Sequence, residues 1–498
     1  MTDDGGRTAD REPPGDQYDD AMRRKVVRSS VWVGLGYGIG QLLTFGSTLV
    51  LVRLLSPSDF GIVAVSVVLL AVVTQVQESG VGAALIHSRR DLSVTAPSAL
   101  VFAASSGFVL TAVTIAIAPL YTHLVRMPEA TPILQTLALV LAIRGLAVVP
   151  GSVIERSLKY RLRTVAELSG ATAQAVVSIA CAVAGLGAWS LVIGQLAGSA
   201  TQASALWALT PWRPSPRNAS RSVLAEMLRY GRFVSATNIV NLANRSIDTV
   251  VVGRVLGSTA AGVYAIAWRL SSMPNTFIGV IVGRVMFAVY ARLQRDLAAV
   301  RTAYVENLQR TLLLALPVTA GLAIATEPIV DALLGDGWEG VVEPLRILAA
   351  YGLVRLITAP SGEVFKGMGK PHLSLFASVV FLVVGLGSLI VLVPRHGTSG
   401  AAFAMLIAVS LSGVVAMAIT LNVLELTVAG LARDLARPFA CALVVALTLA
   451  ALVPATSGLA PWPALAILSC AGTVAFVASV AVIGRPLVAP VRAALRRT

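Results

Sequence analysis

Apolar runs long enough to cross a membrane recur from residue 29 to residue 484, and they limit the possible folds more than any other feature. Of the 498 residues, 56% are hydrophobic and only 13% are charged. A soluble globular protein of this length needs more polar surface than this composition supplies. The runs also lack the apolar/polar alternation over about 10 residues that barrel strands show. The sequence therefore predicts an all-α polytopic membrane protein.

We predict about fourteen transmembrane helices, counted as apolar stretches of spanning length. Gly36 and Gly40 in the first of them form a GxxxG pair, a pattern typical of close helix contacts. The predicted spans are 29–54, 61–86, 98–121, 133–150, 165–185, 187–209, 229–256, 260–285, 307–329, 341–361, 372–394, 398–424, 438–456 and 462–484.

Basic residues gather in alternate loops, which include Arg89 and Arg90, Lys366 and Lys370. The loops on the opposite side carry only scattered basic residues. One of them is acidic and contains Asp331, Asp336, Glu339 and Glu343. By the positive-inside rule, both termini are expected on the cytoplasmic side. The net charge of +14 is thus attributed to membrane topology, and no nucleic-acid partner is expected. A composition rich in Ala and Arg and poor in Lys indicates a GC-rich genome and hence a bacterium, so the expected location is a bacterial cytoplasmic membrane.

A weak internal repeat divides the chain. LVLVRLLSPSDFGIVAVS near the end of the first helix resembles TVVVGRVLGSTAAGVYAIA near the end of the seventh. Arg254 follows Arg53 by 201 positions, as Gly262 follows Gly61. Six helices separate the copies, so the halves share one orientation and are related by an axis along the membrane normal. The expected fold is two six-helix bundles related by a parallel repeat, plus two extra C-terminal helices.

The predicted organisation follows from these boundaries. It comprises a disordered cytoplasmic tail (1–27), an N-terminal six-helix bundle (28–210), a cytoplasmic linker (211–228), a C-terminal six-helix bundle (229–425), helices 13 and 14 (426–484) and a basic cytoplasmic tail (485–498).

Polar side chains at membrane depth are the candidate functional residues. Asn238, Asn241, Arg245 and Asp248 are spaced i, i+3, i+7 and i+10, which places them on one face of a helix. Charged groups at this depth usually face a bundle interior or a watery cavity. This pattern predicts a polar stripe lining a central cavity. A structural ion pair between Arg245 and Asp248 is the alternative.

Arginine dominates the other polar positions. Guanidinium groups suit an anionic ligand, above all phosphate, because their planar fork binds oxyanions through paired hydrogen bonds. For Arg53, Arg254, Arg284 and Arg355 the alternative is snorkelling to lipid head groups. Two roles are considered for Glu78: a proton or cation site, and a structural hydrogen bond. Asp59 is expected to cap its turn. The candidates at this depth are Gln41, Arg53, Gln75, Glu78, Arg254 and Arg269.

No enzyme signature is present: HExxH, GxSxG and GxxxxGK[ST] are all missing from the sequence. The three cysteines and four histidines show no metal-ligand spacing. We therefore expect neither an enzyme nor a metal site.

Four stretches in order resemble the polysaccharide transporter (oligosaccharide flippase) branch of the multidrug/oligosaccharidyl-lipid/polysaccharide exporter superfamily. They are LVRLLSPSDFGIVAV (51–65), ESGVGAALIHSRRDL (78–92), IDTVVVGRVLGSTAAGVYAIAWRLSSMP (247–274) and LLGDGWEGVVEPLRILAAYGL (333–353). The resemblance implies flipping of polyprenyl-diphosphate-linked oligosaccharides for O-antigen, capsule or exopolysaccharide assembly. It also implies that Arg53 and Arg269 match cavity arginines of the related lipid II flippases.

On this hypothesis, alternating access moves a lipid-linked oligosaccharide. Arg53 and Arg269 hold the diphosphate, with Arg254 and Arg245 as second candidates. Asn238, Asn241, Gln41 and Gln75 bond sugar hydroxyls. No cofactor is expected, and coupling to an ion gradient or to the membrane potential stays open. Expected partners are membrane lipids and, by the same resemblance, polysaccharide polymerase and glycosyltransferases. The alternatives are a drug or cation antiporter of the same superfamily and a non-transporting scaffold of a glycan-assembly complex.

Overall fold

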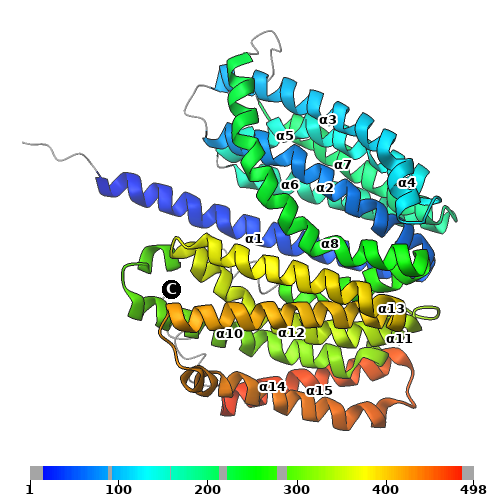
Figure 1. The fold of residues 1–498 in the computed structure, drawn as a ribbon, viewed down its shortest axis with the longest axis vertical. Helices are drawn as coiled ribbons and strands as arrows, with labels where there is room; N and C mark the ends of the chain where they lie inside the picture. Colours follow the sequence, from blue (N-terminus) through cyan, green and yellow to red (C-terminus); the bar gives the residue numbers. More distant parts are fainter. Residues whose placement is uncertain are drawn as a thin grey trace, which may run out of the picture.

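The computed structural model describes residues 15–87, 92–157, 159–211, 221–276, 286 and 289–484. Within these residues the chain is helical and contains no strand (Figure 1). The helices run roughly parallel, as apolar segments must when their backbone groups bond internally across a membrane.

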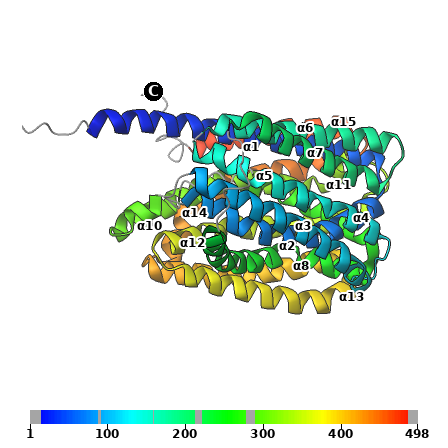
Figure 2. The same cartoon turned by 90° about the horizontal axis from the view of Figure 1, so that it is seen from above.

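The first half of the chain forms seven helices. The first begins earlier than the predicted boundary at 28, because the charged residues before it continue the helix, and it projects beyond the bundle (Figure 2). The helices are α1 (Gly15–Leu54), α2 (Pro57–His87), α3 (Leu92–Leu124), α4 (Ala130–Leu137), α5 (Leu139–Arg156), α6 (Tyr160–Val183) and α7 (Ala188–Leu209).

The second half repeats this arrangement, and two of its helices are bent. The bends lie at Gly257 (φ 86°) and Gly397 (φ 59°), where a positive φ favours glycine. The helices are α8 (Arg221–Ser271), α10 (Leu297–Ile324), α11 (Thr326–Leu333), the short η3 (Glu339–Val341), α12 (Val342–Gly367), α13 (Pro371–Val423), α14 (Val428–Thr456) and α15 (Pro461–Val482).

The predicted count of fourteen membrane crossings is confirmed for the described part of the chain. The bent helices α8 and α13 each supply two crossings, whereas α4 with α5, and α10 with α11, each supply one. Among the described residues, ten stretches are long and apolar enough by themselves to cross a membrane, and one of these is the 53-residue α13.

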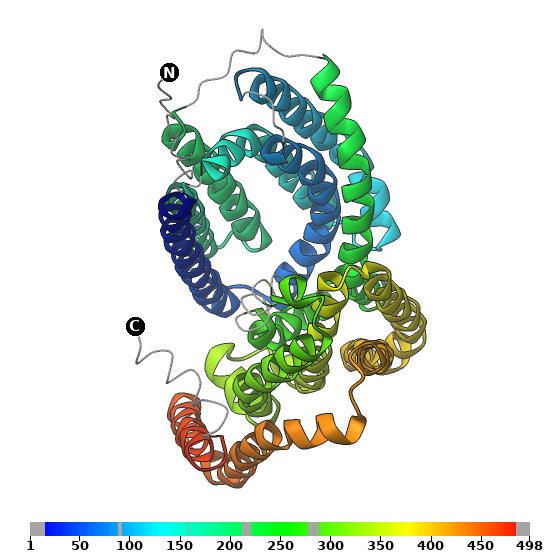
Figure 3. The same ribbon diagram turned by 90° about the vertical axis from the view of Figure 1, so that its left-hand side faces the viewer.

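Helices α1 to α7 form one group and α10 to α13 form a second, and α8 runs between them, packed on α2 of the first and on α13 of the second. Helices α14 and α15 lie on the outer side of the second group (Figure 3). Helix α1 packs along α6, where a Cβ on Gly36 would meet the side chain of Thr164. This contact confirms the close approach that the GxxxG pair predicts.

The two ends of the molecule differ in charge. At one end α1 meets α2, α3 meets α4, and α11 leads towards α12. We call it the acidic end, because Asp331, Asp336, Glu339 and Glu343 lie there. The opposite end, where α5 meets α6 and α12 meets α13, carries Arg156, Lys159, Lys366 and Lys370, and we call it the basic end.

Candidate functional site

Arg53 lies at the acidic end and binds backbone of the other half. Its Nε donates to the carbonyl of Leu333 at 3.3 Å, and its Nη2 donates to the carbonyl of Ala332. The guanidinium also lies 5.8 Å from the ring of Trp462. Arg53 is therefore held at the end of α11 in this conformation.

Arg254 makes the corresponding contact in the opposite direction. It stands near the end of the first span of α8, and its Nη1 donates to the carbonyl of Leu124, the last residue of α3. Both arginines are solvent-exposed. In this conformation both guanidinium groups bond backbone carbonyls of the other half.

Aromatic and hydroxyl groups add further contacts between the halves at the acidic end. The indole of Trp338 donates to the carbonyl of Val52 at 3.0 Å and packs edge-on against Phe60, with ring centroids 5.6 Å apart. The hydroxyl oxygens of Ser58 and Ser258 lie 2.9 Å apart. The sequence offered no signal for Trp338, which is only 2% exposed.

Asp59 caps its turn, as predicted. Its carboxylate accepts hydrogen bonds from the backbone N–H of Ser56 at 3.0 Å and of Ala188 at 2.9 Å. The second bond ties the start of α2 to the start of α7. Asp59 is thus a structural residue within the first half.

Arg269 lies away from both ends. Twelve residues of helix separate it from the bend at Gly257, a rise of about 18 Å, which is near the middle of an apolar layer about 30 Å thick. Its side chain is exposed. Among the described residues it makes no hydrogen bond or ion pair through its guanidinium.

Asp248 departs from the predicted polar stripe. It is 1% exposed, and its carboxylate accepts a 2.9 Å hydrogen bond from the Tyr264 hydroxyl and a 2.8 Å bond from the Thr249 N–H. The expectation that Asp248 faces an open cavity is wrong for this conformation, because both spans of α8 fold around the side chain. A spacing pattern identifies a common face but not what that face contacts.

The remaining candidates divide into two groups. Gln41 is half-buried on α1, and Gln75 is half-buried on α2, where it has a contact within the protein. The side chains of Glu78, Asn238, Asn241 and Arg245 lie outside the described residues, as does the whole of Arg284. Their predicted roles, including the Arg245–Asp248 pair, stay predictions.

Gln77 is a polar residue that sequence reasoning missed. It is 4% exposed and donates to the carbonyl of Leu141 at 2.8 Å, close to where Gly107 and Gly145 bring α3 and α5 together. Its position within an apolar run of α2 was the available signal. Gln77 joins helices inside the first half and does not border Arg269.

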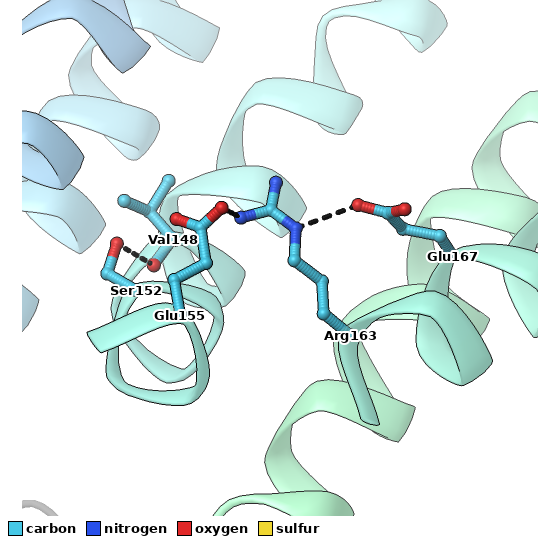
Figure 4. A network of polar contacts seen from close by, with 5 residues as sticks. All are labelled: Val148, Ser152, Glu155, Arg163 and Glu167. Carbon is cyan, nitrogen blue, oxygen red and sulfur yellow. Dashed lines mark hydrogen bonds and ion pairs between the residues drawn. The ribbon is translucent and has the colours of Figure 1, made fainter. Parts of the chain in front are cut away.

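An ion-pair network lies at the basic end. Arg163 lies between Glu155 and Glu167, and its Nε is 2.8 Å from the Glu167 carboxylate (Figure 4). An apolar groove of about 500 Å³ lies nearby between α5 and α7, where Trp207 packs against Leu146. Neither feature includes a predicted site residue.

The arrangement can do two things chemically. The acidic end joins the two halves through hydrogen bonds that need no ligand. The membrane interior presents at least one cation, Arg269, whose donors are available to an oxyanion.

Comparison with known proteins places the chain among polysaccharide exporters. A family described as "Polysaccharide biosynthesis protein" matches residues 50–343. The lipopolysaccharide biosynthesis protein WzxC of Escherichia coli (strain K12) is 24% identical over 71% of this chain and 72% of its own. The succinoglycan biosynthesis transport protein ExoT of Rhizobium meliloti (strain 1021) is 26% identical over 70% of each chain. The lipid II flippase MurJ, in an inward closed conformation, shares the fold with a TM-score of 0.75 at 13% identity, covering 93% of this chain and 100% of MurJ.

Proposed function

The chain belongs to the family of polysaccharide biosynthesis proteins, and from that premise we propose that it flips a lipid-linked oligosaccharide across the bacterial cytoplasmic membrane for surface polysaccharide assembly. Relatives named for lipopolysaccharide biosynthesis and for succinoglycan transport support this function. So does the fold shared with a lipid II flippase.

The observation that carries the proposal is the position of Arg269. A guanidinium near the middle of the membrane that is exposed and bonds no described residue has donors available to an anionic ligand, and charge-assisted hydrogen bonds to phosphate oxygens are strong. The diphosphate of a polyprenyl-diphosphate-linked oligosaccharide is such a ligand. Arg269 is therefore its principal ligand in this proposal. Gln41 and Asn241 remain candidates for the sugar hydroxyls.

The charge difference between the ends supports an orientation. The basic end lies on the cytoplasmic side, together with both termini, and the acidic end faces outward. The substrate enters from the cytoplasmic side while the acidic end is closed, and it leaves after the halves rock apart there. Polymerase and glycosyltransferases would then act on opposite faces of the same membrane.

Reconstituted transport tests the function. A fluorescent polyprenyl-diphosphate oligosaccharide is placed in proteoliposomes, and its arrival on the other leaflet is followed with a membrane-impermeant glycan-modifying enzyme. We expect faster crossing than in protein-free liposomes, and a loss of at least about tenfold in Arg269→Ala, the value of one charge-assisted hydrogen bond.

Arg346→Ala is the matched control, because Arg346 pairs with Glu327 at 3.3 Å within the second half and lies far from the membrane interior. Its crossing rate should equal that of the wild type. Crossing no faster than in protein-free liposomes, with an ion gradient applied, would contradict the proposed function and favour a scaffold.

A further inference from the structure

We propose that Arg53 and Arg254 form a two-part latch that holds the acidic end closed and releases as the two halves separate. Its role in transport rests on the proposed function, whereas the latch itself concerns only the balance between closed and open conformations of this chain.

The two contacts are reciprocal. Arg53 belongs to the first half and binds the carbonyls of Ala332 and Leu333 at the end of α11 in the second half. Arg254 belongs to the second half and binds the carbonyl of Leu124 at the end of α3 in the first half. The arginines correspond to each other in the repeat, as do the helix ends that they bind. One symmetric device therefore joins the halves at two places.

The chemistry of helix ends explains the choice of acceptor. The last four carbonyls of a helix have no donor within the helix, and they carry the negative end of its dipole. A guanidinium donates hydrogen bonds to these carbonyls, and its positive charge interacts favourably with the negative end of the helix dipole. Ala332 and Leu333 are the last residues of α11, and Leu124 is the last residue of α3. Neither arginine can make its contact unless the two halves meet.

The backbone at this end has the same reciprocity. A Cβ on Gly61 would strike the carbonyl of Ser258, and a Cβ on Gly262 would strike the carbonyl of Pro57. In the 201-residue repeat, Gly61 corresponds to Gly262 and Pro57 to Ser258. The starts of the paired helices thus touch backbone to backbone, which is the close approach that brings each arginine to its acceptor.

The solvent exposure of the two arginines indicates that their contacts can break and re-form. Arg53 and Arg254 are both solvent-exposed, so water can replace the carbonyls when the halves separate. A buried guanidinium would be left without a partner at that step and would resist release. The hydrogen bond between an exposed guanidinium and a helix-end carbonyl is strong enough to favour the closed state and weak enough to break when the halves separate.

Distance measurements between the halves test the latch without any substrate. Spin labels are attached at Glu129→Cys and Glu343→Cys, two exposed acidic-end positions in different halves, after replacement of Cys181, Cys441 and Cys470 by Ala. Double electron–electron resonance in lipid nanodiscs then gives the closed and open populations.

We expect Arg53→Ala and Arg254→Ala each to raise the open-to-closed ratio by about tenfold, and the double variant by about a hundredfold, because the contacts are separate. Arg346→Ala should leave the ratio unchanged, since it removes a guanidinium at the same end whose partner Glu327 lies in the same half.

Arg53→Met with Arg254→Met repeats the test in a variant that keeps the apolar stem of each side chain, in case the alanine pair does not fold. A wild-type distance distribution in either folded double variant overturns the latch. Failure of the flipping assay would leave these distributions unaffected, so the two proposals fail separately.

Discussion

Arg53 and Arg254 at the acidic end have the same side chain as Arg269 in the membrane interior, and opposite surroundings. The first two bind backbone carbonyls of the other half. Arg269 bonds no described residue through its guanidinium. The difference follows from which backbone carbonyls lie beside each guanidinium, not from the residue type.

Carbonyls within a helix are already bonded to the N–H four residues later, so an arginine beside the middle of a helix finds no free backbone acceptor. Carbonyls at a helix end are free. An arginine that meets helix-end carbonyls can therefore bond backbone, as Arg53 and Arg254 do. Arg269 bonds no such carbonyl among the described residues, so its donors are available to a side chain or an external anion.

Locking the acidic end is expected to have the largest effect. The Ser58 and Ser258 hydroxyls are 2.9 Å apart, so Ser58→Cys with Ser258→Cys, in the background without native cysteines, should form a disulfide. Oxidised protein should flip at the protein-free rate in the proteoliposome assay, and reductant should restore transport.

Each single cysteine variant serves as the control and should respond to neither oxidant nor reductant. Full transport by protein shown to be cross-linked would mean that transport does not require the acidic end to open. The distinction between latch arginines at that end and a ligand arginine in the membrane interior would then fail.

Removing the buried carboxylate should have the next largest effect. Asp248→Ala leaves the buried Tyr264 hydroxyl without its acceptor, and we expect a loss of about 1–3 kcal/mol in unfolding free energy. Asp248→Asn keeps an acceptor and should lose less. Thermal inactivation of the purified protein measures both. Equal stability of Asp248→Ala and wild type would show that Asp248 is not a structural residue.

Most of the fold could be predicted from the sequence. Apolar runs determine the crossings, and the 201-residue offset between Arg53 and Arg254 predicts the paired halves. The cap at Asp59 follows from local turn chemistry. Each of these depends on contacts between near neighbours or on hydropathy, which a single sequence records directly.

The surroundings of the charged residues could not be predicted. The acceptors of Arg53 lie about 280 positions away and are backbone carbonyls, which have no sequence signature. The spacing places Asp248 on a common helical face with other polar residues, but the contact of Asp248 with Tyr264 depends on the bend at Gly257. Burial of Trp338 similarly requires the two halves to meet.

A smaller effect is expected from Trp338→Phe. The ring can still pack on Phe60, while the hydrogen bond to Val52 is lost, for a change of about 1 kcal/mol. In the spin-label experiment this should raise the open-to-closed ratio by several-fold, less than either latch arginine. A larger shift than in Arg53→Ala would make the indole, rather than the arginines, the main closing contact.

The smallest effect is expected at the basic end. Arg163→Gln removes ion pairs to Glu155 and Glu167, but the arginine side chain is 37% exposed and solvent screens both pairs. The unfolding free energy should fall by no more than about 1 kcal/mol, with closed and open populations unchanged. A shift in those populations would show that the basic end also controls closure.

The most direct test of the central claim is the affinity of purified protein in nanodiscs for a polyprenyl diphosphate, measured for the wild type, Arg269→Ala and Arg53→Ala with Arg254→Ala. We expect Arg269→Ala to weaken binding at least tenfold while the spin-label distances stay as in the wild type. The double variant should change those distances. Unchanged affinity in Arg269→Ala, together with weakened binding and unchanged distances in the double variant, would contradict the account and make the helix-end arginines the ligands.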